Sequence, residues 1–331
     1  MDLDAYTAAR SADWDRLAQL AKRRRLDGRE ADELIDLYQS GASDLSAIKT
    51  IAGSTATGDR LSLALASARL RFTGAGANVF SMLPRFFVYQ LPAALYRIRW
   101  VVLAVAVATV VVATLYAIWI TGNPEVLRNF GTDAQLRQYV DHSFIDYYSN
   151  NPAASFSGQV WTNNAWIAAQ CIAFGITGVY VPFVLLQNAI GVGTAAGVMF
   201  AYGRGDVMFS YILPHGMLEL TSVFVAAAAG LRIFWAWIAP GARTRAQALA
   251  EDGRALFTVA VGCAISLFVS GLIEGFVTPS ELPVWAKITI GALALAAFLA
   301  YMLVLGRRAV RLGETGDLTE YESGSRRVVA G

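Results

Sequence analysis

Three ionisable side chains in the apolar part of the chain are of types that bind ligands or transfer protons, and their spacing could bring them together. His215 and Glu219 are four residues apart, so a helix places them on one face. Glu274 lies near the end of a later apolar segment. Placing an ionisable side chain inside an apolar span costs free energy, so such residues usually have a structural or functional role. Two carboxylates and an imidazole could coordinate a metal, carry out acid–base chemistry, or bind a lipid headgroup or a peptide amine.

Asn163 and Asn164 open another apolar segment and are candidates for the same cluster. In the structural alternative, Glu219 and Glu274 hydrogen-bond to His215, to the two Asn side chains and to backbone, and thereby hold helices together. The pattern His-x-x-x-Glu is loose, and neither H-E-x-x-H nor G-x-S-x-G occurs. We interpret the five residues as a polar cluster for binding or packing. We assign no catalytic residue, expect no cofactor and leave a metal open.

The elements that must position these residues are predicted membrane-spanning helices. The 331 residues are 56% hydrophobic and 16% charged, whereas soluble domains carry about 25% charged residues. A run of about 20 apolar residues spans a bilayer. On this basis we predict an all-α, polytopic membrane protein whose domain 99–306 has about six spans, near residues 100–120, 164–183, 187–203, 211–239, 255–277 and 284–305.

Two prolines give finer expectations within these spans. The apolar stretch 165–202 is too long for one helix, and we expect it to turn between Pro182 and Gln187. Pro214 is expected in the first turn of the fourth span, a position that tolerates a missing N–H.

The distribution of basic residues predicts the topology. With six spans and a cytoplasmic N-terminus, all but four of the 27 Lys and Arg residues fall on the cytoplasmic side. Five spans would place the basic tail, 307–331, on the opposite side. We therefore expect both termini in the cytoplasm of a bacterium, and the polar cluster towards the outer leaflet of its inner membrane.

The remaining segments are predicted to be helical. Residues 1–77 carry balanced charge and apolar residues at helical spacing, which indicates a cytoplasmic helical bundle or hairpin. Asp27-Gly28 and Ser40-Gly41 are expected to separate its helices. Segment 78–98 is aromatic but broken by Pro and Arg, which favours an interfacial amphipathic helix. The loop 122–160 is expected outside, with a short helix.

Small and polar residues mark expected helix contacts. Glycines four apart are typical of close packing between spans, and this chain has two such pairs: Gly193 and Gly197, and Gly271 and Gly275. A stripe of small or polar residues follows one face of the fifth span: Cys263, Ser266, Ser270 and Glu274. Spans rich in Gly and Ala also allow a homodimer. The two Cys, two His and net charge of +2 exclude a disulfide scaffold, a zinc finger and a nucleic-acid binder.

Several motifs resemble one known family. Pro214–Leu220, PHGMLEL, resembles the P-H-G-x-x-E signature of the stage II sporulation protein M family. Further similar segments are Asn163-Asn164, NAIGVG at 188–193 and IEGFVTP at 273–279. The cytoplasmic segment 33–46 resembles the leader region of relatives that form no endospores. The few Lys residues and the abundance of Ala and Arg fit the non-sporulating, actinobacterial branch.

The resemblance implies a bacterial inner-membrane protein. Sporulating relatives act in a complex with peptidoglycan hydrolases. Non-sporulating relatives are envelope proteins, some encoded near MoxR-type AAA+ ATPases and RDD-domain membrane proteins. No established catalytic residue is implied, so His215, Glu219 and Glu274 carry over as motif positions only.

We therefore expect a scaffold or partner-recruiting subunit of a cell-envelope complex, in contact with membrane lipids and other envelope proteins. The alternative is an intramembrane enzyme, or a lipid- or ligand-handling protein, that uses the His/Glu cluster. A transporter is the third hypothesis, and the absence of a polar path through the inner half of the spans argues against it.

Overall fold

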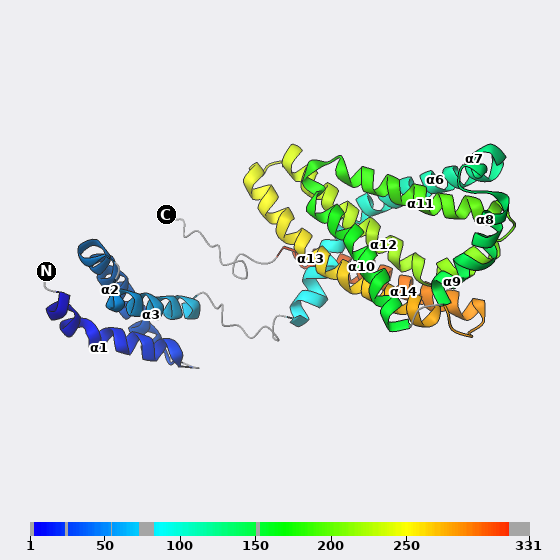
Figure 1. The fold of residues 1–331 in the computed structure, drawn as a ribbon. Coiled ribbons are helices and arrows are strands. Elements are labelled where there is room, and N and C mark those ends of the chain that lie inside the picture. The colour runs from blue at the N-terminus through cyan, green and yellow to red at the C-terminus, as the bar shows by residue number, and fades with distance from the viewer. Residues whose placement is uncertain (1–2, 24–25, 54, 73–82, 150–152, 318–331) are drawn as a thin grey trace. The chain divides into compact units, whose positions relative to one another are not determined.

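The chain forms two helical units. The computed structural model describes residues 3–23, 26–53, 55–72, 83–149 and 153–317, and divides the chain into a unit within residues 1–82 and a second unit from residue 83 to residue 318. Among these residues there are helices and turns but no strand (Figure 1). Five of the helices are long and apolar enough to cross a membrane. The prediction of an all-α polytopic membrane protein is confirmed.

The first unit is a three-helix bundle of α1 (Leu3–Lys22), α2 (Gly28–Ala52) and α3 (Ala56–Phe72). Apolar side chains of all three helices form its core, and the largest fully buried ones are Leu17, Leu20, Leu34, Ile48 and Leu61. The bundle therefore has a core of its own, separate from that of the second unit.

Only one of the two predicted breaks in this unit occurs. Asp27 caps α2, where its side chain accepts a hydrogen bond from the backbone N–H of Glu30 in a capping box. Ser40 and Gly41, expected to separate helices, lie inside the continuous α2. A Cβ at Gly41 would lie 3.3 Å from the side chain of Leu65, so this glycine serves close packing of α2 on α3 and not a turn.

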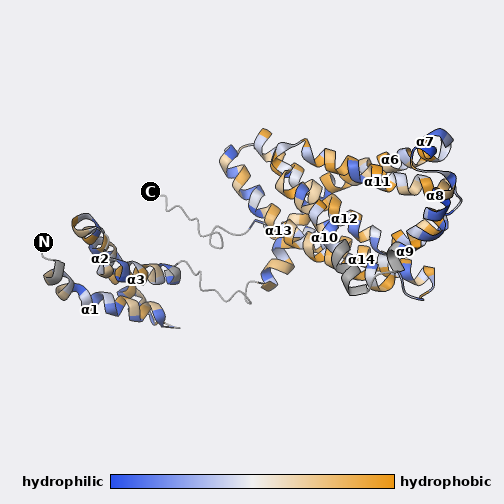
Figure 2. Ribbon diagram, viewed as in Figure 1, coloured by the Kyte–Doolittle hydropathy of each residue, from blue (hydrophilic) through white to orange (hydrophobic). Residues whose placement is uncertain are grey.

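The second unit contains the five candidate spans. They are α6 (Arg99–Gly122), α11 (Tyr180–Ala201), α12 (Gly205–Ile238), α13 (Arg245–Leu272) continued by η4 (Ile273–Val277), and α14 (Val284–Ala300) continued by η5 (Tyr301–Leu305) and α15 (Gly306–Arg311). Their ribbons are mostly hydrophobic in Figure 2. Large apolar side chains remain exposed along α6, among them Leu103, Val107, Leu115 and Ile118, as expected where a helix faces lipid.

The helix α10 (Ala153–Ala173) lies between α6 and α11 in the sequence and returns the chain across the unit. Gly193 of α11 lies against Ala113 of α6, and Gly197 lies against Ala117 further along, so the two helices run parallel. Parallel neighbours require a return pass between them, and α10 supplies it. Within the described residues, α10 is thus a sixth helix that runs through the unit, beside the five that are long and apolar enough to cross a membrane.

The turn between α10 and α11 is not where we predicted it. The chain reverses at η3 (Gly175–Thr177) and Gly178, whose φ of +73° is a conformation that favours glycine. Pro182 instead lies in the first turn of α11, where a helix tolerates proline. The predicted boundary between the second and third spans was therefore several residues too late.

The helix α12 is the centre of the second unit. It packs against α6, α10, α11, α13 and α14, and its segment Ala226–Ala229 is almost completely buried. Small side chains allow this crowding because they let backbones approach closely. α12 begins at Gly205, so Pro214, expected in the first turn, is inside the helix. Its carbonyl oxygen is approached by Gly291 of α14, where a Cβ would lie only 2.0 Å away.

Both ends of the second unit lie side by side. The segment before α6 comprises η1 (Phe86–Gln90) and α5 (Leu91–Arg97), and its residues from Gln90 to Leu95 are buried. Part of the predicted interfacial helix therefore packs into the bundle, while residues 78–82 lie outside the described part of the chain. Arg97 donates a 2.7 Å hydrogen bond to the carbonyl of Thr315, which joins this segment to the chain after α15.

Short helices cover the opposite end: α7 (Pro124–Arg128), α8 (Asp133–Gln138), η2 (Tyr139–Ser143) and α9 (Phe144–Ser149). Asp133 accepts hydrogen bonds from Arg137 and from Tyr202, the residue that follows α11. These two bonds, that from Arg137 first, lower the pKa of the Asp133 carboxyl below its usual value. Arg204, in the turn before α12, forms an ion pair with Asp141 of η2, which links the two segments.

Candidate functional site: a buried His/Glu cluster

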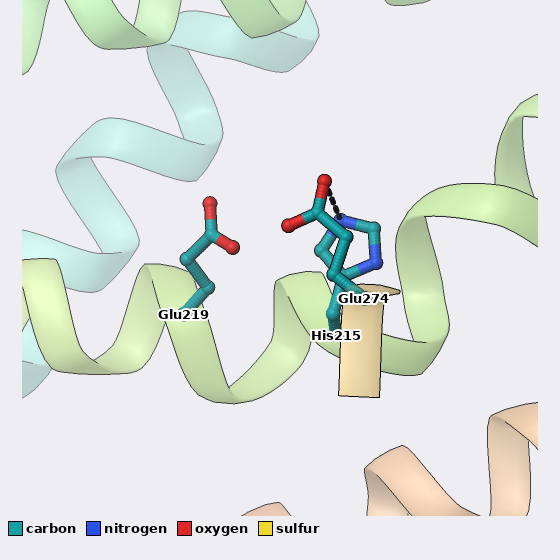
Figure 3. Close-up of side chains that lie close together, drawn as sticks. All are labelled: His215, Glu219 and Glu274. Atoms are coloured by element: carbon teal, nitrogen blue, oxygen red, sulfur yellow. Dashed lines mark ion pairs between the residues drawn. The ribbon is translucent and has the colours of Figure 1, made fainter. Parts of the chain in front are cut away.

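The three ionisable residues singled out in the sequence meet inside the second unit. One ligand atom each from His215, Glu219 and Glu274 lies within 4.8 Å of the other two. The first two residues are one turn apart on α12, and Glu274 comes from η4. Figure 3 shows the two carboxyl groups facing each other, with the imidazole beside Glu274. The distance between His215 Nε2 and Glu274 Oε1 is 3.8 Å.

A π-helical turn presents Glu274 to α12. In η4 the backbone N–H of Thr278 donates to the carbonyl of Ile273, five residues earlier, at 3.0 Å. Such turns widen a helix and are frequent at functional sites. The wider turn also brings the Thr278 hydroxyl to 3.3 Å from His215 Nδ1. Lys287 of α14 donates to the Thr278 carbonyl at 2.7 Å and so holds this turn in place.

The polar stripe on α13 forms the seam with α12. Ser270 donates a 3.0 Å hydrogen bond to the carbonyl of His215. Further along the seam, Ser222 donates to the hydroxyl of Ser266 at 2.7 Å, and the thiol of Cys263 donates to the carbonyl of Ser222 at 3.6 Å. These bonds fix the register of α12 and α13, and therefore the position of the cluster.

Two members of the cluster, His215 and Glu274, are buried, and Glu219 is half-buried. The side chains of His215 and Glu274 are 6% and 4% exposed. Among the described residues, the buried side-chain oxygens that lack a hydrogen-bond partner are Glu219 Oε2 and Glu274 Oε2. A buried polar atom without a partner is costly, and most native structures hold very few of them. These two oxygens therefore have hydrogen-bonding or coordinating capacity that the neighbouring described side chains do not use.

Such an arrangement supports two kinds of chemistry. Carboxylate charges in an apolar bundle need compensation. A proton on one or both carboxyl groups would supply it and would allow proton transfer. A cation held by the imidazole nitrogen and the carboxylate oxygens would supply it as well, and all three groups are normal metal ligands.

The other predicted site residues are distributed over α10, α11, α13 and η4. Asn164 is buried on α10, whereas Asn163 is exposed on the same helix. The close approach of Gly193 and Gly197 to α6 was described above; the second predicted glycine pair, Gly271 and Gly275, is buried at the junction of α13 and η4.

Two contributors to the cluster were missed from the sequence. Thr278 contacts His215, and Lys287 holds the backbone of Thr278. Thr278 was included in the family-like segment 273–279, and it lies four residues after Glu274, but neither signal assigned it a contact with His215. No sequence pattern pointed to Lys287, because its partner is a backbone carbonyl of another element.

Comparison with known families matches the two units separately. The model of the family described as Stage II sporulation protein M matches residues 100–279, a range that contains His215, Glu219 and Glu274. A family described as Domain of unknown function (DUF8413) matches residues 4–74, which correspond to the three-helix bundle. The searches of curated proteins and of solved structures found no match. Since the first match covers more than half of the chain, this protein belongs to the stage II sporulation protein M family.

Proposed function

We propose that this protein is an integral subunit of a bacterial cell-envelope complex in the inner membrane, which uses its N-terminal helical unit to recruit a partner. The observation that carries the proposal is the modular construction. A membrane unit and a helical unit have separate cores, and each matches its own family model. A separately folded bundle at the end of a membrane protein is suited to binding another protein.

The orientation in this proposal rests on charge. The end of the second unit that contains α5 and α15 also carries the basic residues Arg97, Arg232, Arg243, Arg254 and Arg308. Basic residues favour the cytoplasmic side. The N-terminal unit precedes this end in the chain, so we place it in the cytoplasm, and α7–α9 on the outer side.

Cysteine labelling tests the orientation. Ser143 in η2 and Ala242 in the turn between α12 and α13 are both exposed, whereas the native Cys171 and Cys263 are buried. In intact cells, a membrane-impermeant thiol reagent should label Ser143→Cys and leave Ala242→Cys unlabelled until the cells are opened. The opposite pattern would place the N-terminal unit outside and end the proposal of a cytoplasmic partner.

The partner itself is tested by purification after cross-linking in native membranes. The full chain is compared with a chain that lacks residues 1–72 and is expressed at the same level in the membrane. We expect envelope proteins to copurify with the full chain, and those bound through the bundle to be lost with it. Peptidoglycan-remodelling enzymes, MoxR-type ATPases and RDD-domain membrane proteins are the partners that the family resemblance suggests. The same proteins recovered with both chains would contradict recruitment by the bundle.

A second function, in which the His/Glu cluster handles a ligand, is favoured by the unpartnered oxygens of Glu219 and Glu274. If Glu219→Gln keeps all partners but fails to restore function in a deletion strain, the cluster acts beyond assembly.

A further inference from the structure

The His/Glu cluster has the composition and the geometry of a metal site. Its members come from two elements, α12 and η4, and their ligand atoms converge within 4.8 Å. The side chain of Glu274 is 4% exposed, and one of its oxygens lacks a partner among the described residues. An oxygen of Glu219 is in the same state. These oxygens have lost water and gained no hydrogen bond in return, which is the condition of a ligand atom in a metal site.

The two carboxylates of the cluster match the charge of one divalent cation. Among the described residues, neither Glu219 nor Glu274 forms an ion pair with Lys or Arg; the one ion pair recorded for them joins Glu274 to His215. Two carboxylates and one doubly charged cation sum to zero. A neutral site is the arrangement that an apolar bundle accommodates at the lowest cost.

The distances suit a small cation. Two ligand atoms bound at about 2.1 Å in a tetrahedral arrangement lie about 3.4 Å apart. His215 Nε2 and Glu274 Oε1 are 3.8 Å apart, and the ligand atoms of all three residues lie within 4.8 Å of one another. Rotations of the side chains would therefore bring the three ligand atoms to the separations that a bound cation requires.

The Thr278 hydroxyl determines which ring nitrogen of His215 carries the lone pair that faces the cluster. The Thr278 hydroxyl lies 3.4 Å from the carbonyl of Ile273, to which it donates, and 3.3 Å from His215 Nδ1. A hydroxyl that donates to a carbonyl accepts from the imidazole, which places the proton on Nδ1 and the lone pair on Nε2, towards Glu274. Metal-binding histidines are oriented in this way by a partner on the other ring nitrogen.

We propose that His215, Glu219 and Glu274 bind one divalent transition-metal cation, for which Zn²⁺ is the best match. One imidazole and two carboxylates leave a fourth position for water or a ligand, as in zinc sites that are open to chemistry. The site lies in the half of α12 nearer the short helices α7–α9. The proposal does not depend on partner recruitment by the N-terminal unit, so either can fail alone.

Metal binding to the full chain in detergent tests this. The protein is stripped with a chelator, dialysed against Zn²⁺, freed of unbound metal and analysed for zinc per chain. The site variants are His215→Gln, Glu219→Gln and Glu274→Gln. The matched control is Glu281→Gln, which changes an exposed carboxylate seven residues after Glu274. We expect one zinc per chain in the wild type and in the control, and none in the site variants.

Two further measurements cover variants that do not fold. Thr278→Val keeps the side-chain shape and all three ligands but removes the hydroxyl, and should weaken zinc binding by about 10–100-fold. Co²⁺ bound to the wild type should give the intense visible absorption of a four-coordinate site, and excess Zn²⁺ should abolish it. Wild-type protein with no zinc above that of the site variants and no such Co²⁺ spectrum would overturn the proposal, and would leave protons as the charge compensation.

Discussion

Gly230 of α12 lies directly against the backbone of α10, and its replacement by Ala should measurably destabilise the second unit. A Cβ at this position would lie 2.1 Å from the carbonyl oxygen of Cys171 and 3.2 Å from Cα of Gly175. Both neighbours are backbone atoms, so no side chain can rotate away. To restore an ordinary contact distance, α10 and α12 would have to separate by more than about 1 Å.

The size of the effect follows from two opposing terms. Overpacking of this kind costs about 1–3 kcal/mol, and contact with backbone places it at the upper end. Ala has a higher helix propensity than Gly, which returns about 1 kcal/mol. We therefore expect Gly230→Ala to lower the free energy of unfolding by about 2 kcal/mol. For a unit of this size that corresponds to a fall in Tm of roughly 4–8 °C.

Gly191 of α11 supplies the matched control, because a Cβ there would meet nothing within 4 Å. Gly191→Ala should leave the Tm unchanged or raise it slightly. Both variants and the wild type are purified in the same detergent, and thermal unfolding is followed by circular dichroism. If Gly230→Ala unfolds at the temperature of Gly191→Ala, the close contact of α10 with α12 at this position is wrong.

Two predictions concern the three-helix bundle, tested on residues 1–72. The carboxylate of Asp44 accepts hydrogen bonds from Tyr6 (2.6 Å) and from the buried indole of Trp14 (2.9 Å). Asp44→Ala should lower the free energy of unfolding by about 1–3 kcal/mol, measured by urea unfolding that is monitored through Trp14 fluorescence. The control Asp36→Ala, which changes an exposed carboxylate, should alter this free energy little. Equal effects of the two substitutions would contradict the buried hydrogen-bond network. Arg16 donates two 2.8 Å hydrogen bonds to Glu33 and lowers the pKa of that carboxyl below its ordinary value of 4.5. The pair therefore stabilises the fold fully above pH 4.5, and this contribution is lost as the pH falls through the lowered pKa. An NMR titration of the Glu33 carboxyl should show its midpoint moving up towards 4.5 in Arg16→Gln, and an unmoved midpoint would refute the pairing.

The sequence by itself determined the class of the protein. In an apolar run of about 20 residues that crosses a bilayer, the backbone N–H and C=O groups find no partner in the lipid. A helix pairs these groups within the segment itself, so such runs predict helices. Apolar residues recur at helical spacing at Trp14, Leu17, Ala18 and Ala21, which likewise predicts a helix with one buried face. The three-helix bundle buries Trp14, Leu17 and Ala21 and leaves Ala18 half-buried. Local patterns suffice here because length and periodicity are properties of one segment.

Part of the candidate cluster could likewise be predicted from local sequence. The interval of four residues places His215 and Glu219 on one face of α12 whatever the rest of the fold does. Their meeting with Glu274 was expected only from the assumed topology, since it depends on how α13 packs against α12. The serines that set this register, Ser222 and Ser266, are 44 residues apart, and no local pattern links such distant partners.

Glycine shows most clearly what only the tertiary structure decided. Gly41 was expected to interrupt a helix and instead packs against a neighbouring one, whereas Gly178, which no prediction singled out, makes the turn before α11. Gly230 allows a close backbone approach of α12 to α10, and Gly291 allows one of α14 to α12, yet neither belongs to a predicted Gly-x-x-x-Gly pair. A missing side chain permits both a turn and a close contact. The choice between them depends on whether another helix lies opposite, and that is a property of the packed bundle.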